Sequence, residues 1–124
     1  MDAIIHYFRM VNKMYKRGYK FELRVRKYLE DLGYTVFRIA GSKPIDLIAL
    51  SRDKVYIIEC KATKMKNTNI RRMAEKMVKY TKDTIAIPLL AYRDEDNKIV
   101  FFDLRSNAII NIPAANNLEK YTET

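Results

Sequence analysis

The sequence has little cysteine, glycine or proline and no tryptophan: one Cys, three Gly and three Pro occur in 124 residues. The single cysteine, Cys60, excludes a disulfide framework and a cysteine-rich zinc site, and it is typical of a reducing compartment. No run approaches the roughly 20 apolar residues of a membrane span, and the N-terminus lacks the hydrophobic stretch of a signal peptide. We therefore expect a soluble protein that stays in the cytoplasm where it is made.

Internal repeats, low-complexity tracts and flexible linkers are also missing. A length of 124 residues suits one domain and is sufficient for a hydrophobic core that needs no disulfide or metal. The sequence therefore predicts a single domain over residues 1–124, with residues 1–15 as an N-terminal helical extension.

Acidic residues are scarce relative to basic ones. There are 24 Lys and Arg against 15 Asp and Glu, a formal net charge of +9. The excess lies in residues 1–82, which carry 20 basic and 8 acidic side chains, whereas residues 83–124 carry 4 and 7. Positive charge concentrated in one part of a domain is typical of a protein whose partner has a phosphate backbone. A lysine-rich soluble surface is the alternative, and an anionic membrane is less favoured because no basic helix has a large apolar face.

The spacing of apolar residues predicts both helices and strands. Helices are expected over residues 2–16, ending near Gly18, over residues 21–32, ending at Gly33, and around residues 70–79. Short apolar runs bounded by turns predict strands at 34–39, 45–50, 55–58, 85–92, 99–104 and 109–112. Pro88 cannot donate to a ladder, which favours an edge or a bulge for its strand. The fold class is therefore α/β, a mixed central β-sheet flanked by helices.

The candidate site lies at the end of the strand that begins at Val55. Glu59 and Lys61 follow four apolar residues at positions i and i+2, so both point to one face of the strand. The preceding strand carries a single carboxylate, Asp46. If the turn at residues 51–54 joins these strands as an antiparallel pair, residue 46 faces residue 59, and two carboxylates and an ammonium group meet.

That combination of groups suits a metal-assisted reaction at phosphorus. Carboxylate, phosphate and water oxygens are the ligands that Mg²⁺ prefers. Bound Mg²⁺ polarises a phosphoryl oxygen and activates water, and a neighbouring lysine holds that water or stabilises negative charge. Glu22 could add a third carboxylate. The simpler alternatives are an ordinary ion pair of Lys61 with Asp46 or Glu59, and a helical pair of Glu22 with Arg26.

A series of these residues, in order and with their spacing, resembles the archaeal Holliday junction resolvases of the PD-(D/E)xK nuclease superfamily. The series comprises Arg17-Gly18, Glu22, Gly33-Tyr34, Pro44-Ile45-Asp46, Glu59-Cys60-Lys61 and Ile70-Arg71-Arg72. The likeness covers residues 16–105, with Ile45 separating Pro44 from Asp46 where the family has a direct Pro-Asp. It implies a restriction-endonuclease-like nuclease core, and the short chain is consistent with an archaeal viral member that acts in the host cytoplasm.

The resemblance also implies roles for individual residues. Magnesium ligation falls to Glu22, Asp46, Glu59 and the Cys60 carbonyl. Lys61 would position the attacking water, and Ser42, on the loop after the first strand, would approach the scissile phosphate. The catalytic set is then Glu22, Ser42, Asp46, Glu59 and Lys61.

Similar enzymes act as homodimers on four-way DNA junctions and cut two opposing strands. A two-fold dimer presents two symmetric sites to such a junction, and recognition by shape and phosphates needs basic residues. The candidates that flank the site in sequence are Lys16, Arg17, Lys43, Lys64, Lys66, Arg71 and Arg72. Candidates for a dimer interface, unless they form ordinary core, are Phe101, Phe102, Ile109, Ile110 and Ile112.

The sequence thus predicts a Mg²⁺-dependent, structure-selective endodeoxyribonuclease that resolves Holliday junctions by paired symmetric cleavage. Two alternatives stay open: a related nuclease that acts on flaps, ends or duplex DNA, and a non-catalytic nucleic-acid-binding protein on the same fold. The two carboxylates favour an enzyme over a binder, because a protein that only binds DNA gains nothing from acidic groups beside a phosphate path.

Overall fold

The computed structural model describes residues 2–39, 41, 45–63 and 67–115. The chain forms, in order, helix α1 (Asp2–Asp31), strands β1 (Thr35–Arg38), β2 (Leu47–Leu50) and β3 (Val55–Lys61), helix α2 (Asn67–Thr81), and strands β4 (Ala86–Arg93), β5 (Ile99–Asp103) and β6 (Ala108–Ile110). The strands make one sheet in the order β1 to β6. Only β3 and β4 pair in parallel, because α2 crosses over between them; the other pairs are antiparallel. The predicted mixed α/β sheet is confirmed.

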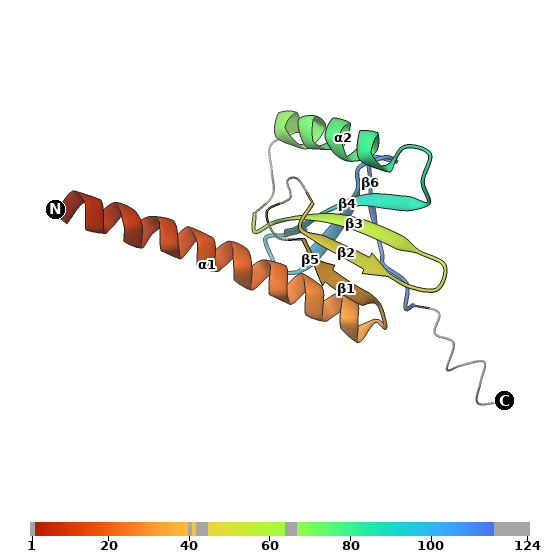
Figure 1. Ribbon diagram of the computed structural model, residues 1–124, viewed down its shortest axis with the longest axis horizontal. Coiled ribbons are helices and arrows are strands. Elements are labelled where there is room, and N and C mark those ends of the chain that lie inside the picture. Colours follow the sequence, from red (N-terminus) through yellow and green to blue (C-terminus); the bar gives the residue numbers. More distant parts are fainter. Residues whose placement is uncertain (1, 40, 42–44, 64–66, 116–124) are drawn as a thin grey trace.

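The two helices lie on opposite faces of the sheet (Figure 1). Along β3, Tyr56 and Ile58 pack in the core that also contains Val25 and Leu29 of α1. Ile57, between them, packs in the second core with α2 residues. This alternation is the period of two expected of a strand that is buried on both faces.

Helix α1 differs from the prediction because it is one continuous helix, not two. Gly18 lies within it, and a Cβ at this position would contact nothing within 4 Å, so the position is open to solvent. Glycine inside a helix costs about 1 kcal/mol relative to alanine but leaves the main-chain hydrogen bonds intact. The N-terminal part of α1 projects beyond the sheet (Figure 1).

The C-terminus of α1 ends as the sequence predicts. Gly33 has a φ of 99°, which is readily adopted only by glycine. Its amide donates to the Glu30 carbonyl at 2.9 Å, and the Tyr34 amide donates to the Leu29 carbonyl at 3.1 Å. This pair of hydrogen bonds is a Schellman motif, and it turns the chain directly into β1.

Strand β4 is central, so of the two positions expected for Pro88, an edge strand or a bulge, the edge strand is wrong. The Pro88 carbonyl accepts a hydrogen bond from the Leu104 amide at 2.9 Å, and its nitrogen faces the same side of the strand. On that side the ladder with β5 ends one residue later, at the pair Leu89 and Asp103. The proline therefore lies just outside the ladder between β4 and β5, at a position where that ladder requires no main-chain donor.

Most of the candidate interface residues belong to the core. Phe101 and Ile112 are buried in the core beneath α1, and Ile110 and Phe102 are partly buried against the two cores. Ile109 alone of the five is exposed, at 65%. None of the helices in the described part of the chain is long and apolar enough to cross a membrane.

Candidate functional site

Asp46 is fixed at the point where β1, β2 and β3 end together. Its carbonyl accepts from the Ile39 amide at 2.8 Å, and its own amide donates to the Ile58 carbonyl at 2.9 Å. Its carboxylate accepts from the Cys60 amide at 2.7 Å, in place of a main-chain acceptor. Asp46 is therefore held by both residues that flank Glu59. The predicted antiparallel register of β2 and β3 is confirmed from the pair Leu50 and Val55 to the pair Leu47 and Ile58. The ladder ends there, and the Asp46 amide donates to the Ile58 carbonyl, so the predicted pairing of Asp46 with Glu59 is not observed.

Glu59 and Lys61 share one face of β3, as predicted. The Lys61 Nζ lies 3.3 Å from Oε1 of Glu59, and the lysine side chain is 44% exposed. Within the described residues Glu59 is the one charged residue classed as buried, at 6% exposure. A buried carboxylate is costly unless a cation stabilises it, and here the cation comes from its own strand. The ion pair of Lys61 with Glu59, named as a simpler alternative, is thus present.

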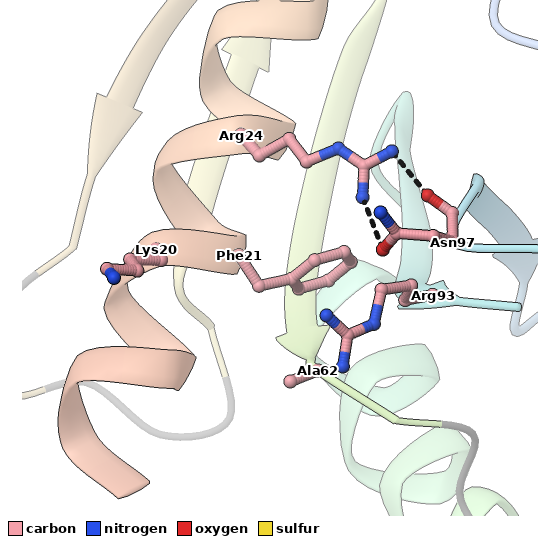
Figure 2. Close-up of a pocket in the computed structure, with 6 residues that line it drawn as sticks. All are labelled: Lys20, Phe21, Arg24, Ala62, Arg93 and Asn97. Carbon is pink, nitrogen blue, oxygen red and sulfur yellow. Dashed lines mark hydrogen bonds between the residues drawn. The ribbon is translucent and has the colours of Figure 1, made fainter. Parts of the chain in front are cut away.

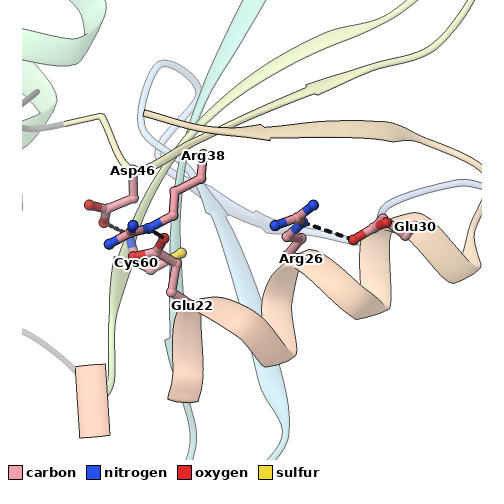
Figure 3. Close-up of polar contacts among 6 residues, drawn as sticks. All are labelled: Glu22, Arg26, Glu30, Arg38, Asp46 and Cys60. Atoms are coloured by element: carbon pink, nitrogen blue, oxygen red, sulfur yellow. Dashed lines mark hydrogen bonds and ion pairs between the residues drawn. The ribbon is translucent and has the colours of Figure 1, made fainter. Parts of the chain in front are cut away.

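Glu22 approaches the same strand ends from helix α1. Its carboxylate accepts from Nε of Arg38, the last residue of β1, at 2.7 Å, and it is only 14% exposed (Figure 3). The helical alternative is wrong, because Arg26 pairs with Glu30 at 3.0 Å instead. Figure 3 shows the Arg38 guanidinium beside Glu22, with Asp46 and Cys60 close by.

The electrostatics show that these groups influence one another. Burial raises the pKa of Asp46 above 3.8, and the negative charge of Glu22 raises it further. The Cys60 amide, Lys61 and Arg38 oppose this rise without cancelling it. The pKa of the Cys60 thiol is also raised, by burial first and then by the surrounding carboxylates, so this thiol stays neutral.

The carboxylates are not gathered into a metal cage by the protein alone. Among the described residues, no three Asp, Glu, His or Cys side chains are placed to hold a metal ion together. The cause lies in the faces of the sheet: Cys60 points toward α1, where Glu22 lies, whereas Glu59 points to the opposite face. Each carboxylate also has a partner of its own. The four-residue ligand set therefore stays a prediction.

The described part of the chain does not include every candidate residue. Ser42, Lys43, Lys64 and Lys66 lie outside the described residues. Lys16 and Arg17 are in the helical backbone of α1, but their side chains are outside the described part. Arg71 and Arg72 are exposed near the start of α2.

Sequence reasoning missed Arg38, which contacts Glu22 and acts electrostatically on Asp46. The alternation of β1 offered a signal, because Val36 is buried against α1 and a residue two positions later faces the same side. Nothing in the spacing indicated that Glu22 would be its partner.

Comparison with known proteins decides the family. The family model described as archaeal Holliday junction resolvase (Hjc) matches residues 13–119. The chain belongs to the Hjc family. The match includes Glu22, Asp46, Glu59 and Lys61, and it leaves residues 1–12 outside.

Two known proteins are similar to this chain. It is 35% identical over 80 residues to the crossover junction endodeoxyribonuclease Hjc of Methanocaldococcus jannaschii, which covers 64% of this chain and 60% of that protein. The chain thus spans about 60% of the length of this curated relative. The structure of Hjc from Archaeoglobus fulgidus, a Holliday junction resolvase, matches with a TM-score of 0.57 and 22% identity over 71% of this chain and 73% of that one. The fold is therefore that of the Hjc nucleases, as predicted.

Proposed function

We propose that this protein is a metal-dependent endonuclease that resolves four-way DNA junctions. The observation that supports the proposal is the position of Asp46, which hydrogen bonds to Ile58 and Cys60 hold at the end of β3, next to the strand that carries the Glu59–Lys61 pair. Membership of the Hjc family supports the same reaction and substrate. A phosphodiester is the substrate that such a group of carboxylates and an ammonium suits, since it needs both a cation and an activated water.

The donor set fits Mg²⁺. Asp46 and Glu59 offer carboxylate oxygens, the Cys60 carbonyl offers a third oxygen ligand, and Mg²⁺ binds to one or two carboxylates while it keeps several waters. Burial, and after it the charge of Glu22, raises the pKa of Asp46, so a cation beside this carboxylate would favour its ionised form. Held by these residues, Mg²⁺ would supply positive charge that polarises a phosphoryl oxygen and lowers the pKa of water.

Lys61 positions the attacking water and stabilises charge at phosphorus. Its ammonium group is a compact donor with three N–H bonds, and Glu59 fixes one side of it while the exposed side faces solvent. Glu22 and Arg38 position charge next to Asp46. Their ion pair holds the Arg38 guanidinium beside the Asp46 carboxylate. For Ser42 we keep the proposal that it approaches the scissile phosphate.

The substrate is bound as a four-way junction by a homodimer. Two copies related by a two-fold axis present two equivalent sites, which paired symmetric cleavage requires. The phosphate contacts come from the predicted DNA-binding set, Lys16, Arg17, Lys43, Lys64, Lys66, Arg71 and Arg72, within a segment that is rich in basic residues. The exposed Arg71 and Arg72 on α2 are the described members of the predicted DNA-binding set.

The test compares a four-way junction with flap and linear duplex DNA of the same sequence, with Mg²⁺ present. We expect two symmetric cuts in the junction and little cutting of the other two. If all three substrates are cut equally, the protein is a general nuclease and the proposal of junction resolution is wrong. Binding without cutting, in Mg²⁺ or Mn²⁺, would replace the enzyme by a DNA-binding protein.

A further inference from the structure

A cationic pocket lies at the end of β3 and β4, beside the candidate active site and separate from it. It has a volume of about 330 Å³ and is lined by Lys20, Phe21, Arg24, Ala62, Arg93 and Asn97. Ala62 directly follows Lys61, and the neighbouring residue on β4, Tyr92, pairs with Lys61 in the sheet. None of the residues named in the proposed reaction lines it.

Two arginines define this pocket. Arg24 of α1 and Arg93 of β4 face each other across it, with the Phe21 ring between them, whereas Lys20 is directed away (Figure 2). Arg24 is held in place, because its guanidinium donates to the Asn97 side chain at 3.2 Å and to the Asn97 carbonyl at 2.5 Å. The Arg93 side chain is exposed, and its guanidinium has no hydrogen bond or ion pair with any described residue.

The donor geometry suits an anion with several oxygens. A guanidinium has five N–H donors, and Arg24 uses one on each of two nitrogens, so donors remain on both arginines. Arginine binds phosphate through two parallel hydrogen bonds, which makes two facing guanidinium groups a suitable cradle. The alternation along β4 places Arg93 on the α1 face, with Leu89 and Ala91, so both arginines lie on one side of the sheet.

The surrounding charges set the direction in which a strand can leave this pocket. No acidic residue lines it, but the adjoining hollow shares Ala62, Arg93 and Asn97 and is bordered by Asp94, Glu95 and Asp96, which belong to the turn after β4. The Asp94 carboxylate is used within the turn, where it accepts from the amides of Asp96 and Lys98. Glu95 and Asp96 are exposed and would repel a phosphate on that side. A DNA strand would therefore pass over the end of β3, toward Lys61.

We propose that the pocket between Arg24 and Arg93 binds a backbone phosphate of the cleaved DNA strand, close to the scissile phosphate. This inference rests on the proposed function and adds to it a path for the strand, from the Glu59–Lys61 pair over the end of β3 to the α1 face. Such a contact fixes the register of the strand in the site without reading its bases.

The test measures binding of a four-way junction to Arg93→Gln in the absence of divalent metal, over a range of salt concentrations. The matched control is Lys82→Gln, which removes one exposed charge near the opposite end of β4. We expect Arg93→Gln to bind about tenfold more weakly and the slope of log affinity against log salt to fall by about 0.9, the contribution of one phosphate contact. The control should retain both values.

A second measurement locates the phosphate. Junctions with a single uncharged methylphosphonate linkage at successive positions beside the cut should weaken binding of the natural protein at one position, and that position should have no effect on Arg93→Gln. Arg93→Lys, which keeps the charge but loses the paired donors, should bind with intermediate affinity. A thermal unfolding curve unchanged from the natural protein shows that each variant is folded.

The possible failures are distinguishable. If the natural protein cuts junctions and Arg93→Gln binds like Lys82→Gln, the pocket is not a phosphate site, and the proposed function stands. If no linkage position depends on Arg93, the strand does not follow this path. If the natural protein does not bind junctions, both proposals are wrong.

Discussion

Asp46 has two separable roles in the structure, one electrostatic and one in hydrogen bonding, and two substitutions distinguish them. In the natural protein the Cys60 amide donates to the Asp46 carboxylate at 2.7 Å. Asp46→Asn keeps an acceptor for this amide. Asp46→Ala removes the acceptor and leaves that amide unsatisfied, which costs about 1–3 kcal/mol. We therefore expect Asp46→Ala to lower the free energy of unfolding by this amount in metal-free protein.

The asparagine variant should behave differently. Burial and the charge of Glu22 raise the pKa of Asp46, so the folded state favours a neutral side chain at this position. A carboxyl group whose pKa is raised on folding stabilises the protein below about 3.8 and progressively less as the pH rises through the folded value. Asp46→Asn should therefore be at least as stable as the natural protein at neutral pH, and the difference should shrink as the pH falls toward 4.

Urea unfolding in the presence of a chelator measures both effects. The control is addition of Mg²⁺, which should stabilise the natural protein by about 2.7 kcal/mol at a hundred times its dissociation constant and should not stabilise either variant. If Asp46→Asn loses as much stability as Asp46→Ala, the carboxylate is favourable in the folded state, and our reasoning about its charge is refuted.

Three further predictions concern the fold. Leu29→Ala, at a fully buried position where α1 packs on the sheet, should cost about 2–5 kcal/mol of unfolding free energy, and a loss below 1 kcal/mol in chemical denaturation would contradict the packing described. Thr81→Ala should lower the free energy of unfolding by about 1–3 kcal/mol, because its buried hydroxyl accepts a hydrogen bond from Arg105 at 2.6 Å. If neither Thr81→Ala nor Arg105→Gln changes the stability, this contact contributes nothing. Burial raises the pKa of Tyr34, so the stability that its neutral hydroxyl contributes is complete below pH 10 and is lost at higher pH. Tyr34→Phe removes a 2.7 Å hydrogen bond to the Pro113 carbonyl, so it should be less stable at neutral pH but should lose less stability on alkaline titration. If the variant and the natural protein lose the same stability at alkaline pH, other groups cause that loss.

Much of the fold was predictable because short-range signals determine it. The tight turn at residues 51–54 fixes the register of β2 and β3, and that register brings Asp46 to the end of β3. Gly33 ends α1 because its positive φ suits glycine. The predicted end of a helix near Gly18 was wrong, because glycine lowers helix propensity without ending a helix. The sequence does not show whether the helical segments on either side of Gly18 form one continuous helix.

The remaining features depend on contacts between distant segments. Pro88 lies in a central strand because β5 ends beside it, which only the assembled sheet reveals. The Glu22–Arg38 pair joins α1 to the end of β1, and the sequence separation of 16 residues carries no period that would indicate it. The Arg24–Arg93 pocket likewise depends on how α1 crosses the sheet.

The most direct test is single-turnover cleavage of a four-way junction with Mg²⁺ by the natural protein and by Asp46→Asn, with junction binding measured in parallel. The account predicts paired cuts by the natural protein, none by the variant, and binding by both. Cleavage that survives Asp46→Asn at an undiminished rate would show that hydrolysis takes place elsewhere on the molecule.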